Sequence, residues 1–65
     1  MSEGYYREVV KKLAQLGYAF HAPAKGSHEK WKHQSSGKMI IVPHNLKSRH
    51  TANSILKDAG SSRKF

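Results

Sequence analysis

The sequence predicts an α+β domain in the order α-β-β-β-α, with a three-stranded antiparallel sheet and two helices on one of its faces. Apolar residues recur with the period of a helix near both ends of the chain. The middle of the chain instead alternates with a period of two, and glycine or proline stands at the boundaries. A sheet of this kind buries one face by packing it against helices, so both helices are expected on the same side.

The first helix is expected over residues 6–16, because the apolar residues of this segment fall on one face of a helix. They are Tyr6, Val9, Val10, Leu13 and Leu16, and charged or polar residues fill the other face. Ser2 is the predicted N-cap of this helix, and Gly17 stands where a helix end favours a left-handed residue.

Alternating residues after Gly17 predict three strands, over residues 18–23, 27–33 and 38–42. Residues 24–26 form a turn between the first two strands. Residues 34–37 form the next connection, in which Gly37 is available for positive φ. Pro23 and Pro43 end the first and third strands, because proline cannot donate a backbone hydrogen bond to a sheet.

The second helix follows a basic loop over residues 44–48, and its apolar face consists of Ala52, Ile55, Leu56 and Ala59. Either Ser48 or Thr51 is its N-cap, and Gly60 ends it. One domain therefore covers residues 1–60, and residues 61–65 form a polar tail that is expected to fray. Double-stranded-RNA-binding domains have the same order of elements, and they recognise nucleic acid by shape and backbone contacts.

Composition and charge favour a protein that binds a polyanion. The 65 residues suffice for one domain, and a net charge of +8 with a pI of about 10.1 favours RNA, DNA, anionic lipid or an acidic protein. A ribosomal or chromatin protein, or charge that serves solubility alone, fits the same composition. The chain has no cysteine, no apolar run of about 18 residues and no apolar leader, so we expect a cytoplasmic protein without disulfides.

Strand parity separates His28 from the expected core. Trp31 is the large apolar residue of the second strand and is expected to face the helices, as a core residue or, alternatively, as a platform for a base. His28 is three residues away, so it lies on the opposite face together with Lys30 and Lys32. No apolar contact explains a histidine at that position.

The chemistry open to such a histidine is general base catalysis on RNA. Neighbouring cations favour a neutral imidazole, which is able to accept a proton from the ribose 2′-hydroxyl. The resulting oxygen attacks the adjacent phosphate, and lysine side chains stabilise the charge that develops there without any metal. The alternative from the residues alone is a surface histidine that contacts phosphate passively.

Several further residues are candidate RNA contacts. Lys30, Lys32, Lys47 and Arg49 are the predicted phosphate-binding residues, and the last two stand near the start of the second helix, whose free N–H groups favour an anion. His44 follows Pro43 and is a candidate general acid for the leaving 5′-oxygen, a role that solvent can also fill. No metal site or cofactor is predicted, because the histidines lack metal-ligand spacing and have cationic neighbours.

Several segments, taken together, resemble the HicA toxin family. They are Gly26-Ser27-His28 followed by Trp31, Val42-Pro43-His44, Leu46-Lys47, and the closing run from Thr51 to Gly60. The resemblance extends from Tyr6 to Gly60. Gly26 is expected to serve the turn that leads into the strand, and the Ser27 side chain to bond to nearby backbone. Many members of the family have a second histidine where this chain has Glu29, so no catalytic role is assigned to Glu29.

The resemblance implies a fold like that of double-stranded-RNA-binding domains and an mRNA-cleaving endoribonuclease, the toxin of a type II toxin–antitoxin pair. It implies His28 as the catalytic residue, mRNA as the substrate and a HicB-type antitoxin as the protein partner. A non-catalytic RNA-binding module is the alternative. The family pattern points Ile40 and Val42 inward and leaves Met39 and Ile41 beside His28, although the apolar run by itself allows the inverse parity. Exposed apolar side chains there predict a docking surface for an acidic antitoxin.

Overall fold

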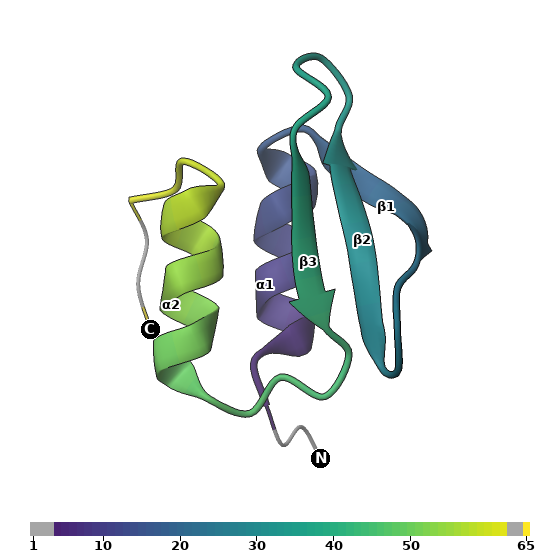
Figure 1. The fold of residues 1–65 in the computed structure, drawn as a ribbon. Coiled ribbons are helices and arrows are strands. Elements are labelled where there is room, and N and C mark those ends of the chain that lie inside the picture. Colours follow the sequence, from purple (N-terminus) through teal and green to yellow (C-terminus); the bar gives the residue numbers. More distant parts are fainter. Residues whose placement is uncertain (1–3, 63–64) are drawn as a thin grey trace.

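The computed structural model describes residues 4–62 and Phe65 and confirms the predicted order of elements. These are α1 (Tyr6–Gln15), β1 (Tyr18–Pro23), β2 (His28–His33), β3 (Met39–Pro43) and α2 (Arg49–Asp58). The strands form one antiparallel sheet in the order β1-β2-β3. Both helices lie on the same side of this sheet, and the other face is open (Figure 1).

Helix α1 is amphipathic as predicted, and it buries Val9 and Leu13. Its N-cap position is Tyr5, while the predicted cap Ser2 lies outside the described residues. Gly17 follows the helix with a φ of 97°, which confirms the predicted left-handed end. A side chain at Gly17 would also bring a Cβ within 2.9 Å of His33 Nε2, so both the backbone and the packing require glycine.

The alternation of β2 and β3 confirms the predicted parity. Ile40 and Val42 are buried, whereas Met39 and Ile41 are 43% and 46% exposed. In β2 the residues that face the helices are partly buried, and His28, Lys30 and Lys32 are exposed on the open face. The sheet therefore has one face that builds the core and one that carries the candidate chemistry.

The core lies between the sheet and the two helices. It consists of Val9, Leu13, Tyr18, Ile40, Val42, Leu46, Ala52, Ile55 and Leu56. Trp31 packs against this cluster but is only partly buried, so its predicted inward orientation is confirmed and its burial is incomplete. No helix within residues 4–62 is long and apolar enough to cross a membrane.

The two ends of α2 are held by specific hydrogen bonds. Ser48 is the N-cap, because its Oγ accepts a hydrogen bond from the Thr51 N–H at 3.2 Å, which decides between the two predicted caps. At the other end Lys38 Nζ donates to the Asp58 carbonyl oxygen at 2.6 Å. This contact joins the β2–β3 hairpin to the negative end of the helix dipole.

The expectation of a frayed tail is wrong at Phe65. Its ring packs against Tyr5 with the centroids 4.8 Å apart, and its N–H donates to Asn53 Oδ1 at 2.8 Å. An aromatic side chain at the end of the tail explains the difference, because it gains apolar contacts that a polar tail lacks. Residues 63 and 64 of the predicted tail lie outside the described residues.

Candidate active site

A tight turn before β2 fixes the backbone of His28, the first residue of that strand. The Lys25 carbonyl accepts a hydrogen bond from the His28 N–H at 3.3 Å, and Gly26 has a φ of 65° at the second position of this turn. Apart from its two chain neighbours, no described residue has an atom within 4 Å of a Cβ built on Gly26, so the backbone conformation alone calls for glycine. The prediction that Gly26 serves the turn is confirmed.

His28 is exposed at the start of β2, and the same turn orients its ring. Its Nδ1 lies 3.2 Å from the Lys25 carbonyl oxygen, which can only accept a hydrogen bond. This contact favours the neutral tautomer with the proton on Nδ1, and it leaves Nε2 as the nitrogen with a free lone pair. The turn therefore presents His28 as a proton acceptor toward solvent.

The open face around His28 is basic and partly apolar. Lys30 pairs with Ile41 across the sheet and Lys32 with Met39, so each lysine stands beside an exposed apolar side chain. A shallow hollow of about 840 Å³ is lined by residues 23–27 together with His28, Lys30 and Ile41. A backbone segment with a phosphate fits such a surface, because its charge and its apolar parts both find partners there.

Ser27 differs from expectation. Its side chain is exposed and forms no hydrogen bond with any residue in the described part of the chain, so the predicted bond to nearby backbone is not found. The Ser27 carbonyl instead accepts a hydrogen bond from the His44 N–H at 2.7 Å. Ser27 is one of the residues that line the hollow beside His28.

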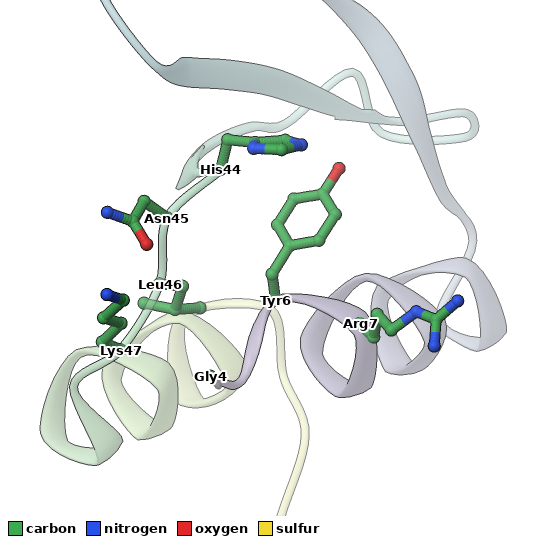
Figure 2. A pocket seen from close by; sticks show the side chains of 7 residues that line it. All are labelled: Gly4, Tyr6, Arg7, His44, Asn45, Leu46 and Lys47. Atoms are coloured by element: carbon green, nitrogen blue, oxygen red, sulfur yellow. The ribbon is translucent and has the colours of Figure 1, made fainter. Parts of the chain in front are cut away.

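The backbone of His44 lies close to that of His28 across the β2–β3 pair, but the His44 side chain points to the opposite face of the sheet. Pro43 is the cross-strand partner of His28, and the ring of the next residue, His44, packs on Tyr6 with the centroids 4.8 Å apart. Figure 2 shows this ring beside Tyr6, above the start of α1. The structure thus brings Lys30 together with His28 in one hollow, and Lys32 lies on the same face but four residues farther along β2. It places His44 on the side of the helices.

The remaining predicted cations are separate from the open face. Lys47 lines a second hollow with Tyr6, Arg7 and His44, and Arg49 is the first residue of α2. Both are exposed. The four predicted phosphate contacts therefore divide into a pair on the open face and a pair near the start of α2.

Glu29 has partners that the sequence analysis did not predict. Its Oε1 accepts hydrogen bonds from the Tyr6 hydroxyl at 2.7 Å and from Trp31 Nε1 at 3.0 Å. Burial, this hydrogen bond and the Glu29 charge together raise the pKa of Tyr6 to about 12. The parity of β2 was the available signal, since Glu29 shares the covered face with Trp31.

Within residues 4–62 and 65, no group of three or more His, Asp or Glu side chains is arranged to hold a metal ion. The site so defined belongs to a small basic α+β domain with one exposed, oriented histidine on an open sheet face. Residues 6–61 match the family model described as the HicA toxin of bacterial toxin–antitoxin systems, so this chain belongs to the HicA toxin family. Comparison with curated proteins and with solved structures gives no significant match.

Proposed function

We propose that this protein is the toxin of a type II pair and acts as a metal-independent endoribonuclease on mRNA, with His28 as the general base. The observation that supports this proposal most strongly is the Nδ1 contact to the Lys25 carbonyl, because it leaves Nε2 exposed as the proton acceptor. The family supports the toxin class, and the residues beside His28 support the chemistry.

In the proposed reaction, His28 Nε2 accepts the proton of a ribose 2′-hydroxyl as the 2′-oxygen attacks the adjacent phosphorus. The P–O5′ bond then breaks, which gives a 2′,3′-cyclic phosphate on one fragment and a 5′-hydroxyl on the other. Water donates the proton that the leaving 5′-oxygen needs. Lys30 lines the same hollow as His28 and stabilises the negative charge on the phosphorane. Lys32 lies farther along the same face and contacts a phosphate of the bound RNA backbone.

Both helices support the binding of a polyanion at this end of the sheet. Figure 1 shows that α1 and α2 start at the end where β2 begins and β3 ends. Helix N-termini carry partial positive charge, and here it adds to Lys47 and Arg49. The RNA backbone is therefore drawn to the end of the molecule that carries His28.

The RNA chemistry gives a direct test that needs no mutant protein. A short RNA that the wild type cleaves should resist cleavage when the scissile ribose is replaced by 2′-deoxyribose, because the nucleophile is then missing. Mass spectrometry of the unmodified substrate should show the cyclic phosphate, and EDTA should leave the rate unchanged. Cleavage of the deoxy substrate, or strong inhibition by EDTA, would refute the mechanism.

The proposed partner is a HicB-type antitoxin in the cytoplasm, which blocks His28 by covering the open face. Met39 and Ile41 are exposed beside the lysines of β2, so an acidic partner with apolar side chains fits both features. Hydrogen exchange of the toxin with and without antitoxin tests this model. Protection should include residues 27–32, and protection confined to the outer surfaces of α1 and α2 would contradict steric blocking.

A further inference from the structure

A second hollow lies at the end of the sheet, between the loop after β3 and the start of α1. It has a volume of about 350 Å³, at the lower end of the range for small-molecule sites. The residues around it that carry the inference are Tyr6, Arg7, His44, Asn45 and Lys47 (Figure 2).

The backbone around this hollow is held in place. The Tyr5 N–H donates to the Leu46 carbonyl at 2.7 Å, and the Leu46 side chain is only 3% exposed. A Cβ on Gly4 would overlap the same carbonyl, so the loop and the start of α1 approach more closely than any other residue allows. The hollow is therefore formed before any ligand binds.

One wall of the hollow is an aromatic platform. The His44 side chain is exposed, and its ring rests on the Tyr6 ring with an angle of 49° between their planes. Tyr6 is itself fixed, because its hydroxyl donates to Glu29 Oε1 at 2.7 Å. Histidine rings stack on unpaired RNA bases, and a supported ring loses little freedom when it does so.

Two cations flank this platform. Arg7 and Lys47 are exposed and lie on opposite sides of Tyr6 (Figure 2). Asn45 adds an amide that is able to donate to and accept from a base edge. The flat ring is a surface on which a base can stack, and the cations beside it can bind the phosphates of a nucleotide.

We infer that this hollow binds a nucleotide adjacent to the cleaved bond, with its base on His44 and its backbone phosphates at Arg7 and Lys47. The inference rests on the proposed ribonuclease function, because it places the hollow beside His28. Pro43 is the cross-strand partner of His28 and His44 follows it, so the Cα atoms of the two histidines are at most about 9 Å apart. His44 is then a binding residue and not the general acid.

Affinity for single-stranded RNA tests the inference in the His28→Ala background, where the substrate stays intact. The probe is a fluorescein-labelled RNA of mixed sequence and about 12 nucleotides, measured by anisotropy. His44→Ala should weaken binding by about 5- to 150-fold, which is the range for loss of one stacking side chain. His44→Phe should retain the affinity, and His21→Ala, which removes another exposed histidine, should leave it unchanged.

The charge component is measured by the salt dependence of the same binding. Arg7→Ala and Lys47→Ala should each reduce the log–log slope by about 0.7. Lys57→Ala removes another exposed cation, from the last turn of α2, and it should leave the slope unchanged.

Cleavage assays with His28 intact distinguish a binding role of His44 from a role as proton donor. His44→Phe should cleave at the wild-type kcat, whereas His44→Ala should raise KM. A His44→Phe protein that binds RNA but fails to cleave it would identify a proton donor and overturn the inference. Variants of His44 and Arg7 that bind like the two controls would also overturn it. If the wild type cleaves no RNA, the proposed function fails. The binding comparison still shows whether the hollow binds a nucleotide.

Discussion

His28 and His33 stand at the two ends of β2, and the same strand points them to opposite faces of the sheet. His33 uses both ring nitrogens: Nε2 donates to the Leu16 carbonyl at 3.0 Å, and Nδ1 accepts from the Ser35 and Ser36 N–H groups at 3.2 and 3.0 Å. Its ring also packs on the Tyr18 ring in a T-shaped arrangement, with centroids 4.9 Å apart. His28 uses only Nδ1, toward the Lys25 carbonyl.

The difference shows what makes one histidine structural and the other available for chemistry. In both residues a backbone carbonyl selects the tautomer. At His33 the second nitrogen is occupied by the hairpin, so no lone pair remains for a substrate. At His28 the second nitrogen faces solvent, and neither the core nor a hairpin depends on the ring.

The largest expected effect is that of His28→Ala on catalysis. Loss of a positioned general base should slow RNA cleavage by roughly 10²- to 10⁴-fold. The melting temperature should stay close to that of the wild type, because the side chain is exposed and makes one long hydrogen bond. Purified His28→Ala and His21→Ala are compared by single-turnover cleavage and thermal denaturation. A wild-type rate in His28→Ala would remove this residue from the mechanism.

His33→Ala should have the opposite effects to His28→Ala: it should lower the stability and leave the cleavage rate unchanged. Three hydrogen bonds and an aromatic contact are lost, which should lower the free energy of unfolding by about 3 kcal/mol. In a domain of this size that corresponds to a drop of roughly 12–24 °C in melting temperature. Urea denaturation gives the first quantity and calorimetry the second. Well below its melting temperature the variant should cleave RNA with the wild-type kcat, and a lost kcat in a stable variant would break the comparison.

Gly26→Ala tests how the turn orients His28 and should have an intermediate effect. A non-glycine residue at a φ of 65° costs about 1–2 kcal/mol, although open space surrounds the position. If the turn relaxes to avoid this cost, the Lys25 carbonyl shifts away from His28 Nδ1. We therefore expect a lower kcat together with a modest loss of stability, measured by the same two assays. Loss of stability with an unchanged kcat would show that the turn does not orient the ring.

Local patterns predicted most of this fold. The helical period, the alternation in β2 and β3, and the positions of Gly17 and Gly60 gave the elements and the face on which His28 lies. These features depend on residues a few positions apart, so a single sequence contains them.

Contacts between distant segments were not predictable in the same way. Tyr6 and Glu29 meet across 23 positions of the chain, and the packing of Phe65 on Tyr5 joins its two ends. The placement of the His44 ring on the helix side follows from the path of the loop after β3, which no residue pattern specifies. The second hollow was therefore invisible until the loop and the start of α1 were seen together.

The smallest expected effect concerns the covered face beside His28, where Glu29 holds Tyr6. Tyr6→Phe should lower the free energy of unfolding by only about 1 kcal/mol at neutral pH, since it removes one hydrogen bond and keeps the ring. The pKa of Tyr6 is raised from 10.0 to about 12 in the folded protein. Below pH 10 the phenol is neutral in both states, so this group adds no pH dependence to stability there.

Between pH 10 and 12 the unfolded chain releases the phenolic proton while the folded protein still holds it, so stability is lost as the pH rises through this window. Urea midpoints of the wild type and of Tyr6→Phe, measured at pH 9 and pH 11, isolate this contribution, because the two proteins differ only in the Tyr6 hydroxyl. The difference between the two proteins should shrink at pH 11. A difference that stays constant would mean that the contact with Glu29 does not raise the pKa of Tyr6 in the folded protein. The covered face of β2 would then lack the hydrogen bond that distinguishes it from the open face.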